Sequence, residues 1–229
     1  ERKRQKRENR MEIKKFFPIW DKMTAGQQEA LVSGARRQVL KKGTVVHRDT
    51  EDCAGLLLLE EGQLRAYMLS EEGREITVYR LLEGDICLFS ASCMIRSLQS
   101  DIVIEAERDS RMWVISPGVY RKLMDESALI ANYTNEIMAS RLTDVMWLME
   151  QVMWKSLDRR LASFLLEEAD LEGSGSLKIT HEMIGNHLGT AREVVTRMLR
   201  YFQSEGMVRL SRGAVESTER KKLEKLGQI

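Results

Sequence analysis

Four side chains in one short stretch have the chemistry and spacing to read DNA bases. They are Arg192, Glu193, Thr196 and Arg197, within the sequence THEMIGNHLGTAREVVTRMLRYF. Arginine can donate two hydrogen bonds to guanine O6 and N7, and a carboxylate can accept one from cytosine N4. If the stretch is helical, these residues and Arg200 share one face, opposite an apolar face. We therefore predict a base-reading surface here.

Two short helices are expected to position these residues. Thr180 suits the N-cap of a helix that ends near Leu188, Gly189 permits a sharp turn, and Thr190 is expected to cap a second helix that runs to about Phe202. This is how a helix-turn-helix presents side chains to the major groove. The alternative is a three-helix core with solvated arginines on one face, but the caps, the turn and the arginine-rich face together favour DNA binding.

A small β-hairpin is predicted after the second helix. MVRL and AVEST flank Ser211-Arg212-Gly213, which suits a wing whose arginines reach phosphate. The residues predicted to contact the DNA backbone are Thr180, Thr190, Arg200, Arg209 and Arg212.

A second stretch, GDICLFSASC, sets Cys87 and Cys93 six positions apart in an apolar run. Such residues could line a ligand pocket, hold a metal, form a redox pair or pack in a core. With Cys53 the chain has three cysteines, an odd number, so reduced thiols are expected. We interpret the stretch as inert packing around an effector pocket, with a reversible thiol switch as the alternative.

The elements around this stretch are predicted to form an antiparallel barrel or sandwich. Short β-like runs extend from Val39 to about Ile115, separated by turns at Gly43, Gly62, Gly73 and Gly84. A helix is expected after Pro18, before the first run.

A long helix is predicted from about Ser127 to Trp154, because this segment has no internal proline or glycine. Apolar residues recur at alternating spacings of four and three, which predicts a parallel homodimer with Asn135 as a register-setting polar residue. The seam comprises Ala131, Asn135, Met138, Leu142, Val145, Met149 and Val152. Residues off the seam are expected to cover the barrel: Ile130, Tyr133, Ile137, Trp147 and Trp154.

Composition limits the remaining classes of function. The 229 residues allow two modules, and a net charge of +1 from 36 basic and 35 acidic residues gives no global argument for nucleic acid. Residues 1–10 are expected to be a disordered basic tail. No apolar run approaches the ~18 residues of a membrane helix, so we expect a cytoplasmic protein without membrane contact. His47, His181 and His187 have no partners at catalytic spacing, so no enzyme is predicted.

In these features the chain resembles the CRP/FNR family of transcription regulators. The family's recognition helix carries an R-E-x-x-x-R pattern, found here from Arg192 to Arg197. The resemblance implies an α+β fold, with an N-terminal antiparallel β-roll of the cyclic-nucleotide-binding jelly-roll type, a dimerisation helix and a C-terminal winged helix-turn-helix. The expected boundaries are a tail at 1–10, a sensing domain at 11–126, the helix at 127–155 and a DNA-binding domain at 156–229.

The resemblance also implies the partners. Arg192 and Arg197 would read guanines and Glu193 a cytosine, in an inverted repeat of double-stranded DNA with TGTGA-like half-sites, since the FNR branch typically has a hydrophobic residue where Arg192 stands. A homodimer and RNA polymerase are the implied protein partners. A ligand-binding regulatory module without DNA binding is the rival for the first half of the chain.

The effector is less readable. In the cyclic-nucleotide branch a glutamate and an Arg-Ser pair hold the ligand; here Phe89 and Ser100-Asp101 replace them, which argues against cyclic AMP. An iron-sulfur cluster commonly needs four thiolates, so it is not expected. The haem branch has Cys-x-His where this chain has Cys87-Leu88-Phe89, so haem stays open only with another ligand such as His47. The candidate pocket residues are Cys87, Leu88, Phe89, Ser90, Ser92, Cys93, Arg96, Tyr133 and Ile137.

Overall fold

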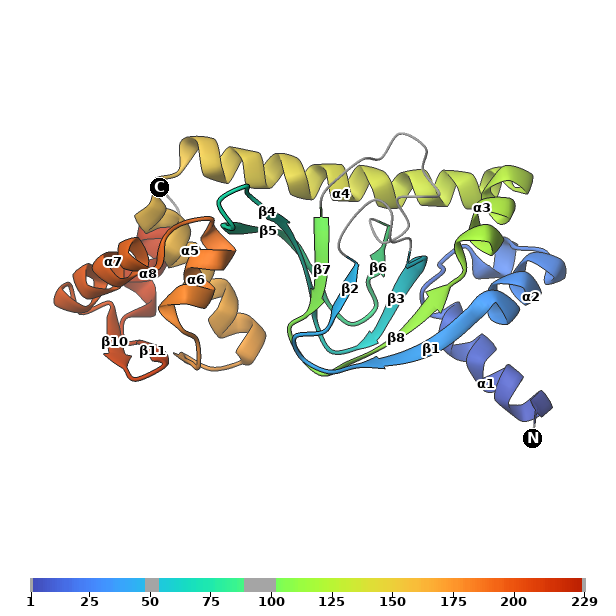
Figure 1. Ribbon diagram of the computed structural model, residues 1–229, viewed down its shortest axis with the longest axis horizontal. Helices are drawn as coiled ribbons and strands as arrows, with labels where there is room; N and C mark the ends of the chain where they lie inside the picture. Colours follow the sequence, from blue (N-terminus) through green and yellow to red (C-terminus); the bar gives the residue numbers. More distant parts are fainter. Residues whose placement is uncertain (1, 48–53, 89–101, 228–229) are drawn as a thin grey trace. The chain divides into compact units, whose positions relative to one another are not determined.

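The computed structural model describes residues 2–47, 54–88 and 102–227 (Figure 1). These residues form two compact units. The first comprises Glu1–Met68 with Val78–Val145, and the second comprises Leu69–Thr77 with Met146–Ile229. Within the described residues, no helix is both long enough and apolar enough to span a bilayer.

Two four-stranded antiparallel sheets make up the β-roll. One has the order β1-β8-β3-β6 and the other β2-β7-β4-β5. The strands are β1 (Ala35–Leu40), β2 (Val45–His47), β3 (Leu56–Glu61), β4 (Leu64–Leu69), β5 (Glu75–Leu81), β6 (Ile86–Cys87), β7 (Ile102–Ala106) and β8 (Ser110–Ile115). Consecutive strands often lie in different sheets, as expected for the predicted jelly roll, which is confirmed.

The central strand β3 is covered on both faces. All four leucines from Leu56 to Leu59 are fully buried, although their side chains alternate between the two faces of the sheet. Leu56 and Leu58 point into a core shared with Trp113 and Ile115 of β8. A continuous apolar run therefore marks the strand that lies deepest in the roll.

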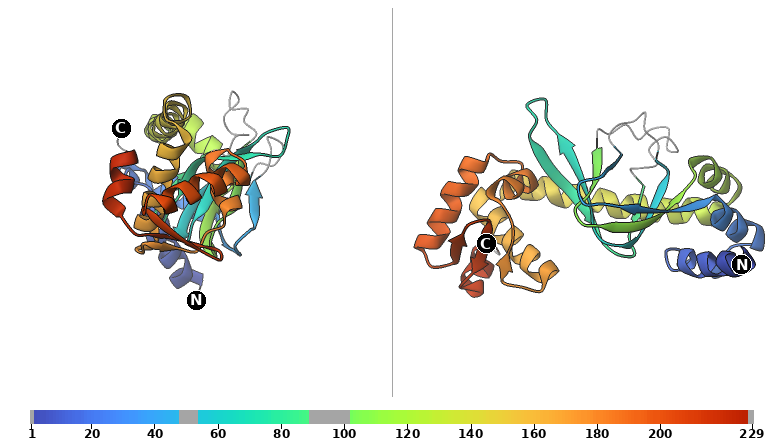
Figure 2. Two further views of the ribbon diagram at one scale, coloured as in Figure 1. Left: turned by 90° about the vertical axis from the view of Figure 1, so that its left-hand side faces the viewer. Right: turned by 60° about the horizontal axis from the view of Figure 1, so that its bottom comes forward.

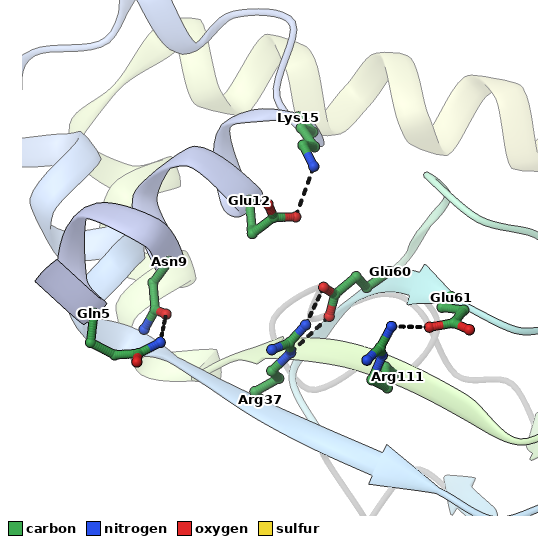
Figure 3. Close-up of polar contacts among 8 residues, drawn as sticks. All are labelled: Gln5, Asn9, Glu12, Lys15, Arg37, Glu60, Glu61 and Arg111. Carbon is green, nitrogen blue, oxygen red and sulfur yellow. Dashed lines mark hydrogen bonds and ion pairs between the residues drawn. The ribbon is translucent and has the colours of Figure 1, made fainter.

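Ion pairs join the exposed parts of the strands (Figure 3). Arg37 of β1 binds Glu60 of β3 through two hydrogen bonds, and its guanidinium lies 5.6 Å from the centre of the Trp113 ring. This pairing raises the pKa of Arg37. Arg111 of β8 forms an ion pair with Glu61 of β3 through one hydrogen bond. Such exposed pairs each contribute about 0–1 kcal/mol, so they fix register more than they supply stability.

Helices close one end of the roll (Figure 2, right). They are α1 (Arg2–Lys14), the 3₁₀ turn η1 (Trp20–Lys22), α2 (Ala25–Gly34) and α3 (Pro117–Glu126). Thr24 begins α2 with a capping box, in which its hydroxyl accepts from the Gln27 amide and the Gln27 side chain accepts from its own. Ile13, Phe16 and Phe17 are buried in the core of this unit.

The expectation of a disordered basic tail at residues 1–10 is wrong. Residues 2–10 belong to α1, in which Lys6 pairs with Glu29 and Arg10 bonds Gln28, both of α2. Arg10 also lies 5.9 Å from the centre of the Trp20 ring. The buried apolar residues that follow the charged cluster anchor the helix, and the basic residues are then held on its surface.

The long helix α4 (Ala128–Trp154) matches the predicted span. Ile130 is fully buried, and Tyr133 and Ile137 pack against the core of the first unit, as expected. Trp147 and Trp154 were expected to cover the barrel, but they are 51% and 76% exposed. Of the seam, Leu142, Met149 and Val152 are exposed, whereas Met138 packs against the core.

The second unit has its own core. Its elements are α5 (Leu157–Glu172), β9 (Ser176–Leu177), α6 (His181–Leu188), α7 (Arg192–Ser204), β10 (Val208–Ser211), β11 (Ala214–Ser217) and α8 (Arg220–Gly227). The strands pair in the order β10-β11-β9, so the predicted wing hairpin is confirmed. Leu161, Leu199 and Phe202 are fully buried between the helices.

A close approach at the turn between β3 and β4 requires glycine. The four predicted turn glycines all have positive φ, and at Gly62 the value is 100°. A Cβ at Gly62 would lie 2.3 Å from Ser110 Oγ and 2.6 Å from the Asp109 carbonyl oxygen. The same hydroxyl accepts a hydrogen bond from the Gln63 amide. A side chain would therefore force β3 and β8 apart.

We predict that Gly62→Ala lowers the free energy of unfolding by about 2 kcal/mol or more, because strain and a backbone clash add. Gly73→Ala is the matched control, since Gly73 also has positive φ, 78°, but nothing lies within 4 Å of its Cβ position. That change should cost about 1 kcal/mol. Thermal unfolding of both variants measures the difference, and equal losses would contradict the clash.

Candidate nucleic-acid interface and sensor site

Helix α6 begins as the sequence predicts. Thr180 is its N-cap, and the hydroxyl accepts a hydrogen bond of 3.1 Å from the Met183 amide. Gly189 ends it with a left-handed φ of 68°. His187 is buried beside the Phe164 ring, whose centre is 5.1 Å from its own, so it is a packing residue, as expected.

The expected cap of the next helix is wrong. The N-cap of α7 is Ala191 and not Thr190, and its side chain makes no capping bond. Thr190 instead belongs to the turn, where its amide donates to the Gly185 carbonyl at 3.0 Å. Gly189 and Thr190 both form the turn after α6, through the left-handed conformation of Gly189 and this backbone bond. The N-cap of α7 therefore lies one residue later than a Thr190 cap would place it.

Contact between α6 and the turn is backbone to backbone. A Cβ at Gly185 would lie 2.7 Å from the Thr190 carbonyl oxygen. Only glycine fits there without displacing the turn. Because the turn carries α7, this close approach fixes the angle between the two helices.

The exposed face of α7 is a row of arginines. Arg192, Glu193, Arg197 and Arg200 are exposed, whereas Val195, Leu199 and Phe202 on the opposite face are buried. Among the described residues, the guanidinium groups of these three arginines have no hydrogen-bond or ion-pair partner. An unpaired guanidinium can donate to bases or phosphates without first giving up a partner. Three of the four predicted base-reading residues therefore lie together and are accessible.

The fourth, Thr196, uses its hydroxyl inside the protein. Its Oγ1 lies 2.9 Å from the Arg192 carbonyl oxygen and 2.8 Å from Nδ1 of His181, the first residue of α6. The sequence interpretation treated His181 as a surface or packing residue and missed this contact. A histidine at the start of one helix and a threonine in the next were the only signal, and no fixed spacing links them.

The wing presents two of the predicted backbone contacts. Arg212 is exposed in the turn between β10 and β11 and has no ion-pair partner in the described part of the chain. Arg209 is exposed on β10, but its guanidinium lies 3.2 Å from a carboxylate oxygen of Glu216 across the hairpin. An exposed pair of this kind is weak, so a phosphate could compete for Arg209.

The candidate effector pocket is described only in part. Phe89, Ser90, Ser92, Cys93 and Arg96 lie outside the described residues. The other candidates, Cys87, Leu88, Tyr133 and Ile137, belong to the first unit.

Cys87 and Leu88 are buried, and Leu88 is part of the core beside β3. The Tyr133 hydroxyl donates to the Phe16 carbonyl oxygen at 2.9 Å, so this side chain holds the N-terminal segment in place. Cys87, Leu88, Tyr133 and Ile137 therefore all pack within the first unit.

A polar cluster beneath α4 was missed by the sequence interpretation. The Tyr79 hydroxyl of β5 lies 3.4 Å from Cys87 Sγ, and burial raises the Tyr79 pKa well above its ordinary value. The Arg141 guanidinium lies 4.9 Å from the Tyr79 ring centre and bonds Asp144 at 2.9 Å. Within the described residues its buried Nε has no hydrogen-bond partner.

Helical spacing could have found Arg141. It continues the roll-facing series Ile130, Thr134 and Ile137 at intervals of three and four. Ile130 and Thr134 are buried, and Arg141 is largely buried, so an arginine in this series must face the roll.

The two residues considered for haem lie in different sheets. Cys87 is on β6 and His47 is on β2, and both are buried. The Cys87 thiol is already in contact with a hydroxyl. Across the ranges that the structure describes, no group of three or more His, Cys, Asp or Glu side chains is arranged to hold a metal ion.

Family models match both halves of the chain. Residues 37–127 match the cyclic nucleotide-binding domain, and residues 159–226 match the Crp-like helix-turn-helix domain. The first range begins inside β1 and contains β2 to β8, and the second contains the α6–α7 pair with its wing.

Individual relatives match three quarters of the chain or more. The cyclic AMP receptor protein of Thermus thermophilus is 24% identical over 93% of this chain and 97% of its own length. The transcriptional activator protein FnrA of Stutzerimonas stutzeri is 27% identical over 76% of this chain and 72% of its own.

A solved structure is much more similar. A protein of the crp/fnr family from Eubacterium rectale is 55% identical, and the match covers 93% of this chain and 99% of that one with a TM-score of 0.92. Together with the two domain matches and the helix-turn-helix described above, this identity shows that the chain belongs to the CRP/FNR family of DNA-binding transcription regulators.

Proposed function

We propose that the protein is a homodimeric, sequence-specific transcription regulator that binds an inverted repeat with TGTGA-like half-sites. The observation that carries this proposal is the row of exposed, unpartnered arginines on α7. In our proposal Arg192 and Arg197 read guanines, Glu193 accepts from a cytosine, and Arg200 and Arg212 bind phosphate. We leave Thr196 out of the base-reading set, because its hydroxyl is already engaged.

The proposed dimer joins two α4 helices. Leu142, Met149 and Val152 repeat with heptad spacing and are 62%, 49% and 46% exposed in the single chain. A stripe that repeats with heptad spacing is complementary to itself, which favours a second copy as the partner. A symmetric dimer then presents two α7 helices to two half-sites.

Effector control is proposed to act through α4. Arg141, which faces Tyr79 in the roll, directly precedes the seam residue Leu142. In this proposal, a ligand that displaces Arg141 rotates or shifts this part of the helix, and the seam moves with it. Coupling of this kind is typically worth about 1–3 kcal/mol. We further propose that the regulator acts together with RNA polymerase.

We propose that the effector is a small molecule other than cyclic AMP or haem. Phe89 and Asp101 replace residues that the family uses for the nucleotide, and Asp101 would repel a phosphate. The Cys87 thiol, the one retained haem-ligand position, is buried against the Tyr79 hydroxyl.

Base reading by Arg197 can be separated from phosphate binding by Arg212. Arg197→Ala should weaken binding to a TGTGA-type inverted repeat by about 1–3 kcal/mol and affect random duplex much less, because one guanine contact is lost. Arg212→Ala should weaken both duplexes equally. Fluorescence anisotropy measures both affinities, and equal losses on the two duplexes for Arg197→Ala would refute the base-reading role.

The α4 seam predicts a change of oligomeric state. Leu142→Glu places a charge in the apolar seam and should convert the dimer to a monomer at micromolar concentration, with a loss of palindrome affinity of about tenfold or more. Ser140→Glu is the control, since Ser140 is exposed on the same helix but lies off the seam. Sedimentation velocity reports the mass, and a Leu142→Glu protein that stays dimeric contradicts this interface.

The proposal about the effector predicts two results. Freshly purified protein should lack the Soret absorption band of haem, and saturating cyclic AMP should leave its affinity for the palindrome unchanged. Either a Soret band or an increase in affinity of about tenfold, the size typical of an allosteric effector, would overturn this part of the proposal.

A further inference from the structure

A three-atom chain of polar contacts links the two helices of the helix-turn-helix. His181 Nδ1 in α6 lies 2.8 Å from Thr196 Oγ1 in α7, and that oxygen lies 2.9 Å from the Arg192 carbonyl oxygen one turn earlier. His181 is half-buried at the first position of α6, immediately after the N-cap. Its ring is thus held beside the arginine row through Nδ1, and its other nitrogen is Nε2.

The protonation state of His181 decides what this chain of contacts can do. A threonine hydroxyl has one hydrogen to donate. If neutral His181 carries its proton on Nδ1, that nitrogen donates to Thr196, which donates to Arg192, but Nε2 is then an acceptor that a phosphate would repel. If the proton is on Nε2, Thr196 must donate to Nδ1 and its bond to Arg192 is lost.

Only the imidazolium ion satisfies both contacts and also leaves a second N–H free to donate. Its Nδ1–H donates to Thr196, the Thr196 hydroxyl donates to the Arg192 carbonyl, and Nε2–H remains as a charged donor. A charged N–H is a strong donor to phosphate oxygen.

The free protein disfavours this charged form. Burial lowers the His181 pKa first, and the positive charges of Arg192 and Arg200 on α7 lower it further. On its own helix, Glu182 follows with an exposed side chain. DNA phosphate close to this surface would oppose both effects, because its negative charge offsets the positive charges of Arg192 and Arg200 and stabilises the imidazolium directly.

We infer that His181 is a DNA-backbone contact that takes up a proton when the protein binds DNA. This inference rests on the DNA-binding function proposed above. The His181 pKa is then higher in the complex than in the free protein. The affinity for DNA therefore increases as the pH falls from the pKa of the complex towards that of the free protein, and this gain in affinity is lost as the pH rises through the pKa of the complex. The contact is to the backbone, so it acts on any duplex sequence.

The test measures binding of the full chain to a random duplex and to the palindrome between about pH 6 and 7.5. Wild type should bind both about fourfold more tightly at the lower pH, a size expected for one histidine whose pKa rises by about one unit. Titration calorimetry in two buffers of different ionisation enthalpy should show uptake of a fraction of one proton.

Two variants separate the charge from the hydrogen bonds. His181→Gln retains a side chain that can bond Thr196 but cannot be charged, so it should bind weakly with no His181-dependent pH effect. His181→Arg is always charged and should bind tightly at both pH values. Thr196→Val removes the hydroxyl and should reduce the pH dependence without removing the exposed arginines.

The outcomes distinguish this inference from the proposed function. If no duplex is bound at any pH, the DNA-binding proposal itself fails. If wild type and His181→Gln bind DNA with the same pH dependence, the DNA-binding proposal stands and the role of His181 is refuted.

Discussion

The proposed dimer and its control by an effector both depend on the two apolar faces of α4, one of which packs on the roll while the other is exposed. Ile130 and Ile137 stabilise the roll by packing against it, while Leu142, Met149 and Val152 stay in solvent on a single chain. Exposed apolar surface of this extent has a cost in water that a second copy removes. Arg141 of the polar cluster and Leu142 of the proposed dimer seam are neighbours on α4, so a shift of the helix backbone at this point affects both.

In the second unit, the absence of a side chain at Gly185 fixes the position of α7. Gly185 lets the Thr190 carbonyl approach α6, and the angle of α7 follows from that backbone contact. Burial of Leu199 and Phe202 then orients the opposite face of α7 outward, with its arginines unpaired. Affinity for an anionic partner needs donors on a fixed backbone that are not already paired with a carboxylate. Glu193 lies on this face, but within the described residues it forms no ion pair with Arg192, Arg197 or Arg200.

The features that could be predicted from sequence are those with local causes. Turn glycines, the wing and the span of α4 depend on backbone conformation and periodicity, which neighbouring residues specify. The prediction of a disordered tail was wrong because Ile13 and Phe17 anchor a helix, although its charged residues alone suggest disorder. The prediction that Thr190 caps α7 was wrong because Thr190 lies in the turn, where its amide donates a hydrogen bond to the Gly185 carbonyl oxygen. The contact between His181 and Thr196 joins two helices that only tertiary packing brings together, so no sequence spacing predicts it. Arg141 differs, because the helical spacing of the roll-facing residues of α4 identifies it.

We propose that the two α7 helices of a dimer read guanines in two half-sites of one duplex. Methylation interference tests it most directly, because methylation at guanine N7 removes the acceptor that an arginine needs in the major groove. We expect loss of binding when guanines are methylated in either of two half-sites whose centres are separated by one helical turn, roughly 10 base pairs. Binding that tolerates N7 methylation throughout the site, or that is sensitive in one half only, would contradict it.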